Sequence, residues 1–121
     1  MENNVIHEKS LVFAVRIVRL CRYLEEKHHE YVMSKQIIRS GTSVGANVRE
    51  SRNAQSDADF VSKLSIALKE ADETQFWLDV LYRSEAIDEK MYMSLNDDVK
   101  ELIALLTSII KTMKSKKCQD E

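Results

Sequence analysis

The chain of 121 residues contains no proline and only two glycines. Because these residues supply most tight turns and irregular connections of β-rich proteins, their near absence argues against a sheet. Hydrophobic residues make up 44% of the chain and charged residues 31%, a balance that excludes most disordered and fibrous classes. The length suits one core, and we predict that residues 1–121 form a single all-α domain.

Apolar residues recur at steps of three and four along four segments of the chain. The predicted helices cover residues 4–28, 35–55, 57–85 and 89–115. Ser34, Ser56 and Asp88 precede the last three segments and are the predicted N-caps. Since the connections are short, neighbouring helices should be antiparallel. The sequence therefore predicts an antiparallel, up-down-up-down, left-handed four-helix bundle, with a frayed tail after the fourth helix.

Charge and cysteine content limit the compartment and the partners. With 18 basic and 20 acidic side chains the net charge is −2, so we expect no overall attraction to nucleic acid or to an anionic membrane. Cys21 and Cys118, together with the lack of a signal-peptide pattern, favour reduced thiols in the cytoplasm. No apolar run approaches the about 18 residues that a membrane span needs. We expect a cytoplasmic protein without a membrane partner.

The segment 39–47 contains both glycines and has low helix propensity. Nevertheless Ile37, Gly41, Val44 and Val48 keep helical spacing, so we predict a helix in which Gly41 and Gly45 allow close contact with a neighbouring helix. A phosphate-binding loop would need a Gly-Lys-Ser/Thr ending after a strand, and the segment has neither.

One side of this helix is polar. Arg39, Ser43, Asn47 and Glu50 lie within about 80° of one another at 100° per residue. The favoured interpretation is a hydrogen-bonded seam that links helices, and the alternative is a surface that contacts a ligand.

Two helices carry more apolar surface than a bundle core uses. Trp77 lies opposite the predicted core stripe of the third helix, as a typical interface anchor would; the alternative is a tryptophan covered by a neighbouring helix or loop. The outer side of the first helix offers a second apolar surface, and two unlike surfaces suit a heterologous ring. The predicted oligomer interface comprises Val12, Val15, Tyr23, Ile66, Glu70, Glu73, Trp77 and Val80.

A basic strip also follows the first helix. Its members are Lys9, Arg16, Arg19, Arg22 and Lys27. Because Glu8 and Glu26 interrupt the strip, ion pairs on a solvated face are favoured over phosphate binding. Any nucleic-acid contact through this strip should be weak.

The sequence contains no convincing catalytic pattern. His28 and His29 are neighbours that point in different directions, and no pair has the HExxH spacing of a metal site. Ser108 and Lys111 match Ser-x-x-Lys, a pattern that is common by chance. We therefore predict no enzyme activity, no metal, no cofactor and no small-molecule substrate.

The segment 34–51, followed by Asp59-Phe60, Lys63-Leu64 and residues 67–71, resembles the four-helix-bundle proteins of the 23S rRNA intervening-sequence family. The resemblance covers about residues 5–115. Its signature, Arg-Ser-x-x-Ser-x-x-Ala-Asn-x-x-Glu, is met by Arg39, Ser40, Ser43, Ala46, Asn47 and Glu50. Members are small bacterial proteins, many without an assigned activity. The resemblance implies a left-handed bundle that assembles into ring-like homopentamers.

A related pentamer, the accessory variability protein of diversity-generating retroelements, has a basic surface that binds nucleic acid and a reverse transcriptase. This chain differs because it is net acidic. We therefore expect a non-enzymatic, homo-oligomeric protein that acts as a binding or scaffolding module, and the resemblance implies that the oligomer is a pentamer. The alternative is an RNA- or DNA-binding accessory protein that acts through a basic face of the oligomer.

Overall fold

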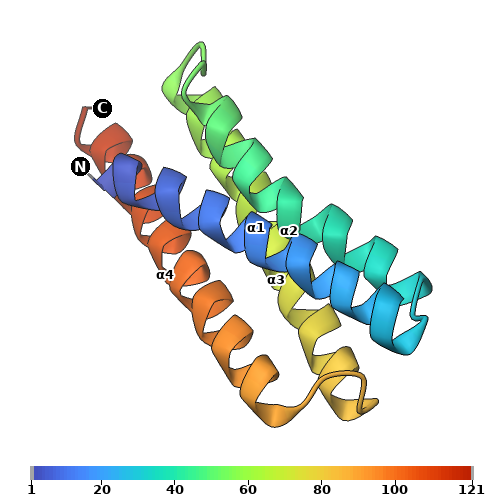
Figure 1. Cartoon of the computed structure of the whole chain (residues 1–121). Coiled ribbons are helices and arrows are strands. Elements are labelled where there is room, and N and C mark those ends of the chain that lie inside the picture. The colour runs from blue at the N-terminus through green and yellow to red at the C-terminus, as the bar shows by residue number, and fades with distance from the viewer. Residues whose placement is uncertain (1, 121) are drawn as a thin grey trace.

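The computed structural model describes residues 2–120, with side chains from Asn4 to Lys116. The chain forms four helices and, within the described residues, no strand: α1 (Glu2–His28), α2 (Val32–Ser51), α3 (Asp57–Arg83) and α4 (Glu89–Asp120). Figure 1 shows these four helices packed lengthwise, joined by three short connections. The predicted all-α fold is confirmed.

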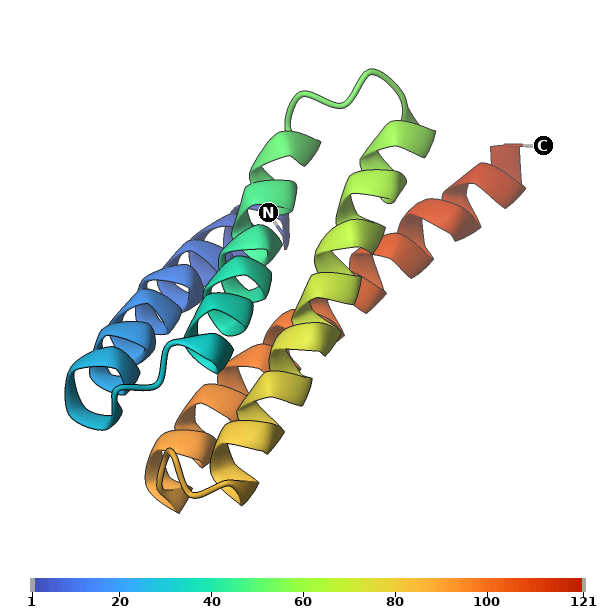
Figure 2. The same cartoon turned by 90° about the vertical axis from the view of Figure 1, so that its right-hand side faces the viewer.

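Neighbouring helices run antiparallel, as the ion pairs between α2 and α3 show. Arg39, early in α2, pairs with Glu73, late in α3. Conversely, Glu50, late in α2, pairs with Lys63, early in α3. Each of α1 and α3 packs against both α2 and α4, whereas no Cα atoms of the described residues of α1 and α3 lie within 8 Å of each other. These two helices therefore lie diagonally across the bundle, and their outer sides face different directions (Figure 2). The hand of the twist stays a prediction.

The apolar positions with helical spacing form the core. Gly41 and Gly45 bring α2 close to α1, because a Cβ added to Gly41 would lie 2.8 Å from Cγ1 of Ile17, and one added to Gly45 would lie 3.2 Å from the carbonyl oxygen of Ser10. The predicted close contact is confirmed. The largest fully buried side chains are those of Phe13, Ile6, Ile17, Leu24, Ile37, Leu64, Leu78, Leu81, Leu102, Leu106, Val44 and Val48.

Two of the three predicted N-caps are confirmed. The Ser56 hydroxyl accepts a hydrogen bond from the backbone N–H of Asp59 at 3.0 Å, and the Asp88 carboxylate accepts one from the N–H of Met91 at 2.8 Å. The Asp59 carboxylate also accepts from the N–H of Gln55 at 3.2 Å, one residue before the cap. These bonds satisfy N–H groups that have no partner within the helix.

The third predicted cap, Ser34, is wrong. α2 begins three residues earlier than predicted, at Val32, and the carboxylate of Glu30 accepts from the N–H of Met33 at 3.0 Å. Ser34 is buried and donates to the carboxylate of Glu25 at 2.9 Å. Glu30 therefore caps the first turn of α2. From the sequence, the charged run that contains Glu30 predicts only where α1 ends.

The helix ends differ from the prediction in other places too. α2 ends at Ser51 rather than at residue 55, because the N–H groups of Arg52, Asn53 and Ala54 bond three residues back and form turns. α3 ends two residues before its predicted end, and the backbone of α4 stays helical to Asp120 through the tail predicted to fray.

Cys21 lies in the contact between α1 and α2. Its thiol donates to the backbone carbonyl of Ser34 at 3.4 Å, and burial raises the pKa of this thiol. Cys118 lies outside the described side chains. Among the described residues, no helix combines the length and the apolar character that a bilayer crossing requires.

Candidate functional site

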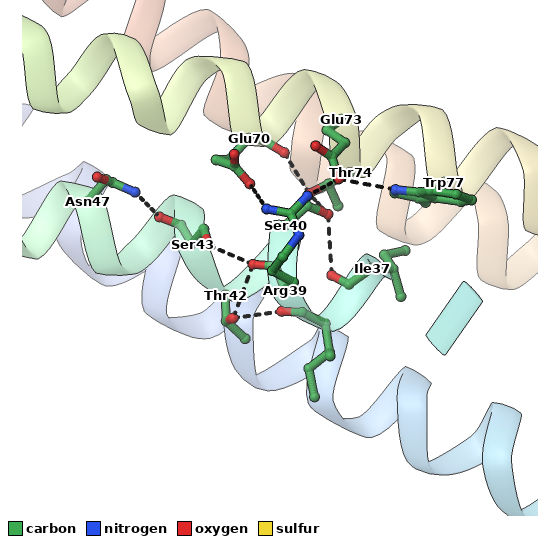
Figure 3. A network of polar contacts seen from close by, with 11 residues as sticks. Ile37, Arg39, Ser40, Thr42, Ser43, Asn47, Glu70, Glu73, Thr74 and Trp77 are labelled. Carbon is green, nitrogen blue, oxygen red and sulfur yellow. Dashed lines mark hydrogen bonds and ion pairs between the residues drawn. The ribbon is translucent and has the colours of Figure 1, made fainter. Parts of the chain in front are cut away.

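A cluster of polar side chains joins α2 to α3 near the middle of both helices (Figure 3). We call it the α2–α3 seam and define it as Arg39, Ser40, Glu70, Glu73 and Thr74. The guanidinium of Arg39 bridges two carboxylates: its Nη1 donates to Glu70 at 3.1 Å, and its Nη2 donates to Glu73. Glu70 and Glu73, which were predicted at an oligomer interface, thus have a partner within their own chain.

The inner part of the seam is a buried hydroxyl pair. The oxygens of Ser40 and Thr74 are 2.9 Å apart, and both residues are fully buried. The Thr74 hydroxyl also bonds to the backbone carbonyl of Glu70 at 2.7 Å, and that of Ser40 lies 3.4 Å from the carbonyl of Ile37. Because no buried side-chain polar atom in the described residues lacks a partner, the seam is accommodated without an unsatisfied group.

The other polar side chains of α2 bond along the helix. The Ser43 hydroxyl donates to the carbonyl of Arg39 at 2.6 Å, and the Asn47 amide donates to the carbonyl of Ser43 at 2.8 Å. Glu50 lies 3.7 Å from Lys63 of α3. Arg39 and Glu50 of the predicted polar side therefore contact α3, which agrees with the favoured interpretation of a link between helices, whereas Ser43 and Asn47 bond within α2.

The electrostatics of the seam follow from its geometry. The hydrogen bond from Arg39 holds the pKa of Glu73 below its ordinary value, and the indole N–H of Trp77, which donates to the same carboxylate at 3.3 Å, acts in the same direction. Both carboxylates of the seam are thus paired with the same guanidinium. The arrangement of the seam is that of a fixed structural contact.

The outer side of α3 carries several apolar residues among polar ones such as Lys69, but Trp77 is not the most exposed of them. Trp77 is half-buried against the core, whereas Phe76 is 55% exposed and Ile66 is 40% exposed. The rings of Phe76 and Trp77 meet edge to face with centroids 5.1 Å apart. Val80 is half-buried and lines a shallow hollow of about 530 Å³ beside Phe76. The sequence predicted Trp77 as an exposed anchor, and this prediction is corrected because Trp77 is half-buried. Phe76, which was not predicted, is the more exposed aromatic residue.

The outer side of α1 carries its own apolar residues. Val5, Val12 and Val15 are 42%, 48% and 43% exposed and lie within about 80° of one another on the helix. Tyr23, also predicted at the interface, is half-buried, and its hydroxyl lies 3.1 Å from the Nε2 of His28. Val5 was not predicted, although its spacing from Val12 is that of one helical face.

Comparison with known proteins identifies the family. The model of the 23S rRNA-intervening sequence protein family matches residues 2–108. The chain belongs to this family. A crystal structure of a protein of unknown function from the S23 ribosomal protein family of Bacteroides thetaiotaomicron is similar over 92% of this chain and 99% of that chain, with 58% identity and a TM-score of 0.91. No curated protein gives a match.

The structure shows where each residue of the family signature lies and what it contacts. Arg39 and Ser40 belong to the α2–α3 seam, Ser43 and Asn47 bond along α2, and Glu50 pairs with α3. Ala46, the remaining signature residue, is exposed. Three of the polar signature residues, Arg39, Ser40 and Glu50, thus contact α3, which gives them a structural role between the helices.

The predicted basic strip is partly neutralised. Lys9 pairs with Glu101 at 2.6 Å, and Arg16 pairs with Asp98 at 2.5 Å and also donates to the Ser94 hydroxyl at 2.8 Å. These partners lie on α4, not on α1 itself, so the sequence neighbours of the strip do not reveal them. Within the described part of the chain, Arg19, Arg22 and Lys27 have no carboxylate within 4.0 Å. The described residues also contain no group of three potential metal ligands.

Proposed function

We propose that this family member is a non-enzymatic binding or scaffolding protein that works as a homo-oligomer, with five subunits in a closed ring. The observation that carries the proposal is the pair of exposed apolar surfaces on α1 and α3. We define the α1 face as Val5, Val12 and Val15, and the α3 face as Ile66, Phe76, Trp77 and Val80.

Each face is concentrated on one side of its helix. At 100° per residue, the members of the α3 face fall within an arc of about 100°. Single exposed apolar residues are common on soluble proteins, but several on one side of a helix, with an aromatic pair among them, are typical of a protein interface. Phe76, which is 55% exposed, would lose most of its water contact in such an interface.

The positions of the two faces favour a ring over a symmetric dimer. α1 and α3 are diagonal in the bundle, so one subunit presents two different surfaces in two directions. A contact between the α1 face of one subunit and the α3 face of the next is heterologous, and such contacts form rings when the rotation closes. The number five comes from the resemblance to the family.

The alternative function, RNA or DNA binding through a basic face, has weaker support. Lys9 and Arg16 are paired with carboxylates of α4 and contribute little net field. The remaining basic residues are interspersed with acids, and the whole chain has a net charge of −2. A mixed-charge surface favours a protein partner.

Two measurements test this proposal. Size-exclusion chromatography with light scattering should give about five times the chain mass of 14.0 kDa at micromolar concentration. A monomer would contradict it. Pull-downs from the native host, with and without nuclease, then separate the two functions: partners should survive nuclease treatment, whereas their loss would favour the nucleic-acid alternative.

A further inference from the structure

Two adjoining hollows at one end of the bundle share the side chain of His7. The first, about 200 Å³, lies between α1 and α2, and its lining includes Leu11, Ala14 and Arg49. The second, about 590 Å³, lies where α2 ends and α3 begins, and its lining includes Arg52 and Asp57. This end of the bundle contains the start of α1 and the connection between α2 and α3 (Figure 2).

The shared histidine is held by an arginine. The Nε of Arg52 donates to the Nε2 of His7 at 3.3 Å, so the imidazole is neutral and keeps its proton on Nδ1. Partial burial and the nearby guanidiniums of Arg52 and Arg49 lower the pKa of His7. Two cations therefore act on one imidazole at the junction of the hollows.

Among the described residues, no acid neutralises these two cations. Within the described residues, neither Arg49 nor Arg52 has a carboxylate within 4.0 Å. Of the described residues, Asp57 is the single acid that lines the two hollows, and it lies at the first position of α3, where it complements the helix dipole. α4 contributes Met113, which is uncharged. The junction is thus a positive recess beside an apolar one.

We propose that these hollows bind a phosphate monoester with a small apolar group. Its phosphate lies between Arg49, Arg52 and His7, and its apolar part lies against Leu11 and Ala14. Two guanidiniums offer more N–H donors than the two oxygens of a carboxylate use, whereas a phosphate dianion matches both charges and donors. The linings of the two hollows share no residue with the α1 and α3 faces.

The test follows the His7 imidazole resonances by NMR in the full chain. The probes are phenyl phosphate and inorganic phosphate, at an ionic strength held constant with sodium chloride. We expect saturable shifts, tighter binding of phenyl phosphate, and a higher pKa of His7 in the complex, because a bound dianion favours the imidazolium form. A response that sodium chloride reproduces, or no preference for phenyl phosphate, would overturn the proposal.

Four variants locate the site. Arg49→Ala and Arg52→Ala should each weaken phenyl phosphate binding about tenfold or more, because each removes a charge-assisted contact. Asp57→Asn should strengthen binding, since it removes the one negative charge of the lining. Arg22→Ala, at an exposed position of α1 outside the hollows, is the matched control and should leave affinity unchanged. Equal weakening by Arg22→Ala would show non-specific attraction and contradict the site. Thermal melts check that each variant is folded.

Discussion

The hydroxyl oxygens of Ser40 and Thr74 are 2.9 Å apart within the contact between α2 and α3, where neither residue is exposed to solvent. A one-turn shift of α2 along α3 would break this contact and leave each hydroxyl only a carbonyl of its own helix, that of Ile37 for Ser40 and that of Glu70 for Thr74. Loss of a buried hydrogen bond is unfavourable, so the pair penalises other registers. We infer that it fixes the alignment of the two helices.

Replacement of either hydroxyl should lower stability, and replacement of both should cost less than the sum. Thr74→Val leaves Ser40 with only the distant carbonyl of Ile37, and we expect each single change to lower the free energy of unfolding by about 1–2 kcal/mol. In Ser40→Ala/Thr74→Val neither hydroxyl is left unpaired. Urea unfolding of the unaltered protein, the two single variants and the double variant measures this double-mutant cycle. Thr107→Val, at an exposed position, is the control. Strictly additive losses would show that the pair has no coupling.

The outer part of the seam predicts a dependence on pH. Because Arg39 depresses the pKa of Glu73 in the folded state, the pair stabilises the fold above the ordinary pKa of 4.5, and this contribution is lost as the pH falls through the lower folded value. In Arg39→Gln that contribution is absent. Urea midpoints of the two proteins should therefore differ most at pH 7 and converge at acid pH. A difference that does not change between pH 7 and pH 3 would assign the stabilisation to packing of the Arg39 side chain.

The close approach of α1 and α2 predicts a penalty for a single methyl group. In Gly41→Ala the new Cβ would lie 2.8 Å from a branch atom of fully buried Ile17. Overpacking of this kind costs about 1–3 kcal/mol, against a gain of up to about 1 kcal/mol from helix propensity. The melting temperature should fall. The penalty should shrink in an Ile17→Ala background, which removes the opposing atoms; an equal penalty in both backgrounds would place the strain elsewhere.

Nucleic-acid binding should be weak and highly sensitive to salt. If Arg19, Arg22 and Lys27 contact phosphates, each contact should contribute about −0.9 to the slope of log affinity against log salt for duplex DNA. Fluorescence anisotropy with labelled DNA across a salt series measures this slope, and Arg19→Glu should reduce it. Sequence-selective binding that persists at high salt would contradict the scaffold proposal.

Features that depend on a single helix could be predicted from the sequence better than contacts that depend on how two helices pack. Helical spacing was enough to predict that segment 39–47 stays helical despite its glycines, and the caps at Ser56 and Asp88 are local. The partner of Gly41 and the α4 partners of Lys9 and Arg16 depend on how the helices are aligned, which no spacing within one helix encodes.

The outer surface of α3 shows how residue angles around a helix relate to the observed exposure of its side chains. Measured from Phe60, Phe76 lies at about 160° and Trp77 at about 260°, while the buried stripe surrounds 0°. Phe76 thus points most directly away from the core, and Trp77 lies toward the α2 side, where its indole reaches Glu73. The helical angle therefore favours Phe76, not Trp77, as the exposed aromatic residue of this face.

The most direct test of head-to-tail assembly uses two variants that each damage one face. Val15→Glu places a charge in the α1 face, and Phe76→Glu places one in the α3 face; both positions are exposed in the single chain, so each variant should stay folded. Helical circular dichroism checks the fold.

Light scattering should find each variant alone as a monomer of 14.0 kDa, because every subunit then lacks one of the two faces. A mixture keeps one intact pair of faces, the α1 face of the Phe76→Glu chain and the α3 face of the Val15→Glu chain. We predict that the mixture, and neither variant alone, forms a species of twice the chain mass. A mixture that remains monomeric, while the unaltered protein forms a larger assembly, would contradict contact between the α1 and α3 faces.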